Sequence, residues 1–156
     1  MPRLDRLPEL NRNALLTFPA PIYETTPFTS PARPLSACRV ALVTTAGLHL
    51  RDDSAFVGGD QTYRIIPSSA SASDIIQSHS SIGFDRVPIQ RDLNITFPID
   101  RLRELAERGE IGSIATNFYS FMGAQRDAKR IETETGPEVA RALRADGVDV
   151  AFLTPT

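Results

Sequence analysis

Three groups of polar side chains follow apolar segments of the chain, and the first stands at the end of residues 39–44. There Thr44 and Thr45 are followed by Ala-Gly-Leu and then by His49. Hydroxyls and free backbone N–H groups at such a turn can hold an anion or a carboxylate. The same residues also suit an ordinary turn with a solvated imidazole, so the pattern leaves both interpretations open.

The second group lies in residues 116–123, after the apolar segment 111–115. Asn117, Tyr119 and Ser120 stand there among two phenylalanines and a methionine. We expect a loop whose rings shape an apolar pocket and whose polar groups orient a substrate. Alternatively, the aromatic residues belong to the core and the polar groups only satisfy the backbone.

The third group closes the sequence, where Thr154 follows the apolar run 148–153. The runs 39–44, 111–115 and 148–153 are short and rich in β-formers, so each is expected to be a buried strand. Helices or long connections separate them, which requires crossover connections. This order predicts an α/β fold of three layers with a mostly parallel, incomplete sheet.

The carboxyl ends of parallel strands lie at one edge of a sheet, where open α/β sheets bind their ligands. We therefore expect the three groups to converge into one substrate-binding site. Its predicted members are Thr44, Thr45, His49, Asn117, Tyr119, Ser120 and Thr154. The set has no carboxylate pair, no serine with a His–Asp relay and no cysteine nucleophile. It can bind a substrate, but no catalytic residue is expected within the chain.

Two helices are predicted from their end signals. Asp100 is the expected N-cap of a helix over 101–108, which Gly109 ends. The string Thr135-Gly-Pro-Glu138 fits a capping box, in which the threonine hydroxyl and the glutamate side chain satisfy the first N–H groups of a helix. That helix is expected to run to residue 145.

Residues 62–77 are expected to lie at the periphery. The segment 62–66 looks like an edge strand that Pro67 stops. The serine-rich segment 68–73 has the composition of a flexible loop. A single helical turn is predicted at 74–77.

The composition of the 156 residues argues against several classes of protein. A net charge of −2, with the arginines dispersed among acids, gives no basic field for a nucleic acid. No apolar run reaches the roughly 20 residues of a membrane span, and signal-peptide features are missing, so we expect a cytoplasmic protein. One cysteine, Cys38, allows no intrachain disulfide, and with two histidines no metal site is expected.

The chain divides by composition at residue 37. Seven of its twelve prolines lie in residues 1–37, which predicts an irregular arm. Residues 38–156 are expected to form the α/β domain. The apolar anchors of the arm are expected to be Phe18, Ile22, Tyr23 and Phe28.

Six short strings follow one another from the first apolar run towards the end of the chain. They are Arg39-Val-Ala-Leu-Val-Thr-Thr-Ala-Gly-Leu-His49, Tyr63-Arg-Ile-Ile-Pro67, Phe97-Pro-Ile-Asp-Arg-Leu-Arg-Glu-Leu105, Ile111-Gly-Ser113, Tyr119-Ser-Phe-Met-Gly123 and Asp146-Gly-Val-Asp149. In this order they resemble the selenoprotein B subunit family of glycine, sarcosine, betaine and D-proline reductases. The order is more specific than any single motif.

The resemblance implies an α/β protein whose selenocysteine, or a cysteine in its place, directly follows a strand ending in a Leu-Thr-x-Thr stretch. Here that stretch is Leu153-Thr-Pro-Thr156, so the nucleophile is expected beyond Thr156. The implied reaction is reductive cleavage of a C–N bond in a small amino-acid-like substrate. The implied partners are a separate subunit, whose pyruvoyl group activates the substrate, and thiol redox proteins. No cofactor is expected in this chain itself.

The chain departs from the family pattern, because selenocysteine is missing and Cys38 precedes the first strand. We expect a UGA codon read as a stop at position 157, since a parallel sheet needs neighbours on both sides of its strands. The chain would then be an inactive fragment of a reductase subunit. The alternative is a short, non-catalytic binding or assembly module for a partner enzyme. An enzyme using His49 as a base ranks last, because no carboxylate in the motif orients the imidazole.

Overall fold

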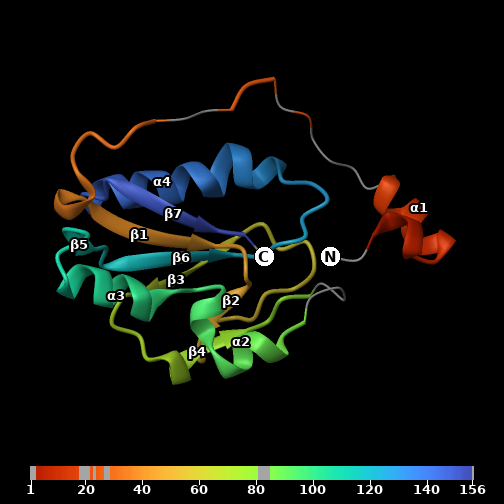
Figure 1. Ribbon diagram of the computed structural model, residues 1–156, viewed down its shortest axis with the longest axis horizontal. Helices are drawn as coiled ribbons and strands as arrows, with labels where there is room; N and C mark the ends of the chain where they lie inside the picture. The colour runs from red at the N-terminus through yellow and green to blue at the C-terminus, as the bar shows by residue number, and fades with distance from the viewer. Residues whose placement is uncertain (1–2, 18–21, 23, 27–28, 81–84, 156) are drawn as a thin grey trace.

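The computed structural model describes residues 3–17, 22, 24–26, 29–80 and 85–155. Helices lie on two sides of a mixed, mostly parallel sheet, which confirms the predicted α/β fold (Figure 1). The expected anchors Phe18, Tyr23 and Phe28, together with Thr156, fall outside these ranges, while the fourth anchor, Ile22, is 96% exposed.

The elements have the following bounds. The strands are β1 (Arg39–Thr44), β2 (Leu48–Leu50), β3 (Tyr63–Pro67), β4 (Ile75–Gln77), β5 (Ser113–Ile114), β6 (Asn117–Phe121) and β7 (Val150–Thr154). The α-helices are α1 (Glu9–Leu16), α2 (Val87–Arg91), α3 (Ile99–Glu107) and α4 (Gly136–Ala145). A π-helix, Ile131–Thr135, leads into α4, and short 3-10 helices cover Leu4–Arg6, Leu35–Ala37, Ala72–Asp74 and Leu93–Ile95.

Strand β1 is the centre of the main sheet. On one side it pairs in parallel with β7, from Val40 with Val150 to Thr44 with Thr154. On the other side its beginning pairs with β5 and its end with β6, both in parallel. Strand β3 then pairs antiparallel with β6. Within the described residues β3 and β7 each pair on one side only, so the prediction of an edge strand at 62–66 is confirmed.

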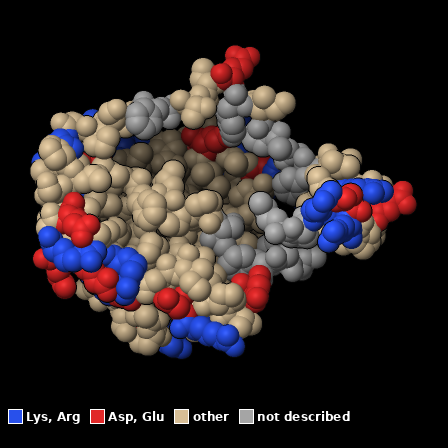
Figure 2. Space-filling view, viewed as in Figure 1, with Lys and Arg blue, Asp and Glu red and all other residues tan. Residues whose placement is uncertain are grey.

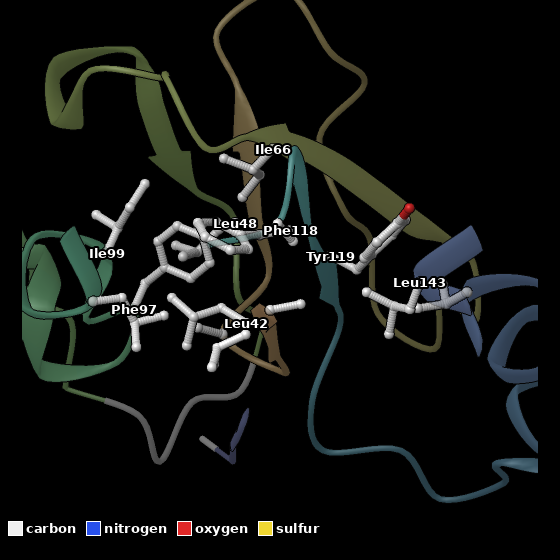
Figure 3. Packing of buried hydrophobic residues seen from close by; sticks show 14 of the residues in the cluster. Leu42, Leu48, Ile66, Phe97, Ile99, Phe118, Tyr119 and Leu143 are labelled. Carbon is white, nitrogen blue, oxygen red and sulfur yellow. The ribbon is translucent and has the colours of Figure 1, made fainter. Parts of the chain in front are cut away.

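Helices α3 and α4 cover opposite faces of this sheet. Successive side chains of a strand point to opposite faces. Leu42 and Phe118 therefore point towards α3, where the Phe118 and Phe97 rings meet edge-on with centroids 5.8 Å apart (Figure 3). Tyr119 points the other way, towards Leu143 of α4 (Figure 3). Burial of apolar side chains on both faces supplies the main stabilisation of the sheet.

The structure corrects two predictions of secondary structure. Residues 116–123 were expected to be a loop, but most of them form β6, which is hydrogen-bonded to both β1 and β3. The predicted helical turn at 74–77 is instead β4, which pairs antiparallel with β2. In both places a neighbouring strand completes the hydrogen bonds that the isolated segment could not make.

The two predicted N-terminal caps are also wrong. Pro98 occupies the N-cap position of α3, and Asp100 lies in the first turn, where its carboxylate accepts from Arg103 at 2.8 Å. The Thr135 hydroxyl donates to the Gln61 carbonyl at 2.9 Å and makes no cap hydrogen bond. A capping box is not needed there, because the π-helix runs directly into α4. Gly109 does end α3 as predicted, with a φ of 70°.

The last strand differs from its prediction in burial. Residues 148–153 were expected to be buried, but Ala151, Phe152 and Leu153 of β7 are exposed. Phe152 is 47% exposed and Leu153 is 65% exposed. Strand β7 therefore shows apolar side chains at a sheet edge that has no neighbour among the described residues.

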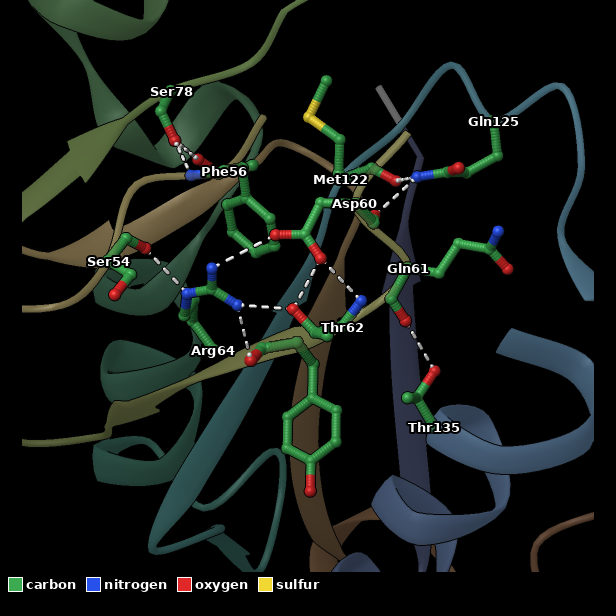
Figure 4. A network of polar contacts seen from close by, with 12 residues as sticks. Ser54, Phe56, Asp60, Gln61, Thr62, Arg64, Ser78, Met122, Gln125 and Thr135 are labelled. Carbon is green, nitrogen blue, oxygen red and sulfur yellow. Dashed lines mark hydrogen bonds and ion pairs between the residues drawn. The ribbon is translucent and has the colours of Figure 1, made fainter. Parts of the chain in front are cut away.

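Asp60 is the centre of a polar network between the loop after β2 and strand β3 (Figure 4). Its Oδ1 accepts from the Thr62 N–H at 2.8 Å and the Thr62 hydroxyl at 2.6 Å, and its Oδ2 accepts from Arg64 at 3.2 Å. Arg64 also donates to the Ser54 carbonyl at 2.8 Å and lies over the Phe56 ring. Burial alone would raise the pKa of Asp60, but the hydrogen bonds from Thr62 and the charge of Arg64 hold this pKa below its usual value.

Backbone groups of the same loop fasten it to neighbouring elements. Gln125 Nε2 donates to the carbonyls of Asp60 at 2.8 Å and Met122 at 3.0 Å (Figure 4). The bond from Thr135 to the Gln61 carbonyl ties the loop to the start of α4. The loop between β2 and β3 is therefore fixed by hydrogen bonds to the segment after β6 and to α4.

Charged side chains on the face seen in Figure 2 are of mixed sign over α1 and α3, and the middle of this face is mostly uncharged. No helix among the described residues is both long enough and apolar enough to cross a membrane. In the same residues, no group of three or more His, Cys, Asp and Glu side chains could hold a metal ion.

Leu42→Ala should lower the free energy of unfolding by about 2–5 kcal/mol, because Leu42 is fully buried in the centre of β1. Urea denaturation followed by circular dichroism measures the loss. Leu10→Ala is the matched control, since Leu10 on α1 is 81% exposed, and it should change stability by less than about 0.5 kcal/mol. Equal losses in the two variants would contradict the described core.

Asp60→Asn should reduce the dependence of stability on acid pH. A carboxylate with a lowered pKa stabilises the folded state above its unfolded-state pKa, near 3.8, and this contribution disappears as the pH falls through the folded-state value. The variant should therefore be less stable than the wild type at neutral pH, and the difference should shrink in acid. Thermal unfolding over this pH range measures it, with the exposed Asp52→Asn as control. A difference that stays constant with pH would exclude this role for Asp60.

Candidate functional site

The predicted site begins at the carboxyl end of β1, where three strands come into register. Thr44 lies opposite Ser120 of β6 on one side and opposite Thr154 of β7 on the other. All three strands are parallel here, so their carboxyl ends share one edge of the sheet. The predicted convergence is therefore present for these three residues.

The hydroxyls of Thr44 and Ser120 are engaged by the fold. The Thr44 Oγ1 donates to the Thr154 carbonyl at 3.1 Å and accepts from the Ala46 N–H at 3.2 Å. The Ser120 Oγ accepts from the Leu48 N–H at 2.8 Å. Both residues are 0% exposed, so the bonds hold the turn from β1 into β2 rather than a ligand. Neither hydroxyl is available to a substrate.

Thr45 and Thr154 form the accessible part of the same edge. The Thr45 N–H donates to the Thr154 carbonyl at 3.2 Å, which extends the pairing of β1 with β7 by one residue. Both residues are partly exposed. The Thr154 Oγ1 is buried and has no hydrogen-bond partner among the described residues. Buried polar atoms normally have a partner, so this hydroxyl needs one that the described residues do not supply.

His49 lies in β2, beyond the turn that follows β1, and is 4% exposed. Its Nδ1 is 2.7 Å from the Leu50 carbonyl oxygen. Because a carbonyl oxygen only accepts, Nδ1 carries the proton and the imidazole is held in one orientation. Its Nε2 is buried without a hydrogen-bond partner among the described residues. The Leu50 carbonyl thus orients the His49 imidazole. The sequence motif contained no carboxylate that could take this role.

Asn117 and Tyr119 do not join this group. Asn117 begins β6 and pairs with Pro67, at the opposite end of that strand from Phe121. Tyr119 is buried on the α4 face, where its ring meets the Tyr63 ring edge-on at 5.8 Å. Burial, with a smaller effect of Tyr63, raises the pKa of Tyr119. Two interpretations of residues 116–123 were left open. The structure agrees with the one in which the aromatic residues belong to the core.

The opposite end of the sheet is held by Asp146. Its carboxylate accepts from Arg39 Nη2 at 2.8 Å and from the Thr116 N–H at 2.7 Å and hydroxyl at 3.0 Å. Burial would raise its pKa, but these hydrogen bonds and the Arg39 charge lower it overall. The contacts join the start of β1, the β5–β6 junction and the turn before β7. This cluster gives a structural role to Asp146 of the string Asp146-Gly-Val-Asp149.

Three arginines that line a separate cavity were not among the predicted site residues. Arg86 and Arg91 stand at the two ends of α2, whereas Arg51 is far from both in the sequence. No simple motif connects the three. They come together only through the pairing of β2 with β4 and the packing of α2.

Comparison with known proteins gives a consistent result. The family described as Glycine/sarcosine/betaine reductase selenoprotein B matches residues 9–156. The D-proline reductase subunit gamma of Acetoanaerobium sticklandii is 42% identical over 137 residues, 87% of this chain and 54% of that protein. The Sarcosine reductase complex component B subunit beta of Peptoclostridium acidaminophilum is 29% identical over 145 residues, 89% of this chain and 33% of that protein.

A third relative extends the comparison. The Glycine reductase complex component B subunit gamma of Carboxydothermus hydrogenoformans is 28% identical over 151 residues, 92% of this chain and 34% of that protein. The chain thus spans about half the length of the first of these curated relatives and about a third of the other two. No solved structure matches the chain significantly.

Ser120→Ala tests whether this hydroxyl is structural. It should lower the free energy of unfolding by about 1–3 kcal/mol, because the Leu48 N–H would be left buried without its acceptor. Thermal or urea unfolding measures the loss, and Ser69→Ala at an exposed position is the control. An unchanged stability in Ser120→Ala would show that the Leu48 N–H does not depend on this bond.

Proposed function

The chain belongs to the glycine/sarcosine/betaine reductase selenoprotein B family, and from this premise we propose that it serves in a multi-subunit reductase that cleaves a C–N bond of a small amino acid. Its proposed part is the wall of the active site at the carboxyl edge of β1 and β7. The reactive selenol or thiol is proposed to follow the Leu153-Thr-Pro-Thr156 stretch directly, as in the family pattern.

The Thr154 hydroxyl at the end of β7, for which the described residues offer no partner, is the observation that carries this proposal. A nucleophile at position 157, three residues after the end of β7, would lie near this hydroxyl and near Thr45 at the same edge. Open α/β sheets place their chemistry just beyond the carboxyl ends of the strands. The geometry of this edge supports the proposed position of the nucleophile.

The proposed reaction replaces the Cα–N bond of the substrate by a C–H and an N–H bond, and it oxidises two thiols to one disulfide. A selenolate or thiolate is the nucleophile that such a step needs. A pyruvoyl group on a partner subunit would supply the carbonyl that activates the amino group. A thiol redox protein would supply the two electrons.

Residues of this chain act by binding and orientation in this scheme. Thr154 can donate a hydrogen bond to the substrate or accept one from it. The His49 Nε2, which is left with a lone pair once Nδ1 is protonated, can accept a proton or a hydrogen bond. The Thr154 Oγ1 and the His49 Nε2 are both buried, so they would act in surroundings with little water.

D-proline is the proposed first substrate to test. The identity of 42% to a D-proline reductase subunit exceeds the 29% and 28% found for the sarcosine and glycine reductase relatives. Cleavage of the Cα–N bond of D-proline opens its ring and gives 5-aminopentanoate.

A non-catalytic assembly module is the second candidate, and the exposed side chains of β7 favour it. Phe152 and Leu153 present apolar surface at a sheet edge that no described strand covers, and such an edge is a common binding surface for another chain. In this case the chain would fasten a partner enzyme without contributing to the reaction.

One experiment separates the two candidates. The protein is tagged in its host and purified with its partners, and the assembly is assayed with a dithiol and each of D-proline, glycine, sarcosine and betaine. The reductase proposal expects 5-aminopentanoate from D-proline, with a selenium- or cysteine-bearing form of this protein in the active fraction. If the intact complex reduces none of the four substrates, the reductase proposal is excluded, and the non-catalytic assembly module remains as the candidate function.

Thr154→Val in the same assembly tests the role of the hydroxyl. Valine has nearly the same shape, and no described residue loses a hydrogen bond to Oγ1, so the unfolding midpoint should not change. We expect kcat/KM to fall about tenfold, because the transition state would lose one hydrogen bond to a charged group. Thr133→Val on the exposed π-helix is the control. Equal activity in Thr154→Val and wild type would exclude this hydroxyl from the site.

A further inference from the structure

A cavity of about 430 Å³ lies between the β2–β4 ribbon and α2. Its volume is in the range of small-molecule sites. Arg51, Arg86 and Arg91 line it, and its lining contains no aspartate or glutamate. We name this cavity the arginine pocket.

The three guanidinium groups are available to a ligand. Within the described part of the chain none of them forms an ion pair. One N–H of Arg51 donates to the Ser73 carbonyl at 2.9 Å, and one of Arg86 donates to the His79 carbonyl, which positions both groups. Among the described residues no other acceptor is found for their remaining N–H donors. Three like charges around one cavity repel one another unless an anion lies between them.

Six of the nine other lining residues are apolar, and the remaining three are Ser73, Gln77 and Gln90. Leu48 is 0% exposed and Ile89 is 7% exposed, and both contribute to the wall. Ile75, Ile76 and Leu93 add further aliphatic surface. Inorganic phosphate would leave this surface in contact with water, whereas a ligand with an aliphatic body would cover it.

We infer that the arginine pocket binds a small aliphatic carboxylate that carries no positive charge. A guanidinium group matches a carboxylate with two parallel hydrogen bonds. A zwitterionic amino acid fits less well, because its ammonium group would face three guanidinium groups with no carboxylate in the lining to balance it. The site is thus distinct from the proposed amino-acid site at the end of β7, and it does not rest on the reductase function.

Titration calorimetry on the purified assembly tests the ligand class with five probes: pentanoate, acetate, pentanamide, norvaline and inorganic phosphate. We expect pentanoate to bind at least about tenfold more tightly than acetate, because each added methylene buries apolar surface. Pentanamide should bind at least about tenfold more weakly than pentanoate, because it lacks the charge. Norvaline should also bind more weakly than pentanoate. Equal binding of phosphate and pentanoate, or tighter binding of norvaline, would overturn the proposal.

Arg91→Gln locates the site. Arg91 makes no hydrogen bond or ion pair with another described side chain, so the variant should fold normally and lose about tenfold in pentanoate affinity. Arg141→Gln, on the exposed surface of α4, is the matched control and should bind like the wild type. Ile75→Ala should weaken the binding of pentanoate and leave the binding of acetate unchanged. Pentanoate binding that survives both Arg91→Gln and Ile75→Ala would place the ligand elsewhere and overturn the proposal.

Discussion

The pairing of β1 on both of its sides is the constraint on which the other features depend. Its backbone N–H and C=O groups meet β7 on one side and β5 and β6 on the other, all in parallel. A buried strand must satisfy these groups, because an unpaired one costs free energy. The pairing brings residues more than 100 positions apart into register, and it aligns the ends of the three strands at one edge.

This alignment divides the polar residues near the edge into two kinds. Thr44 and Ser120 use their hydroxyls to turn the chain from β1 into β2, which also places His49. Thr154 and His49 each keep one buried polar atom for which the described residues offer no partner. The fold therefore uses some of the polar groups that the sequence suggested and leaves others without a partner among the described residues. Only the second kind supports a functional proposal.

The sequence predicted the parts of the fold that local pattern determines. Val40, Ala41 and Leu42 belong to an apolar β-rich run, and they are buried at the centre of the sheet as such a run predicts. Gly109 ends α3 because a residue without Cβ adopts the left-handed conformation without strain.

Elements that depend on distant partners were missed. Residues 117–121 contain asparagine and serine, so they looked like a loop, yet β1 and β3 supply hydrogen bonds on both sides. Strands β2 and β4 are three residues long and are stable only as a pair. The same pairing gathers the three arginines of the pocket, so that site could not be predicted from spacing. Thr135 was predicted to cap α4, but its hydroxyl donates to the Gln61 carbonyl instead.

We propose that the reactive group follows β7 at the edge formed with β1. Alkylation of the active assembly with iodoacetamide, followed by peptide mass spectrometry, would locate this group. We expect inactivation to accompany labelling of a selenocysteine or cysteine in the peptide that continues from Leu153, and substrate to slow this labelling. Inactivation that accompanies labelling of Cys38 or of a partner subunit, with that peptide unmodified, would contradict it.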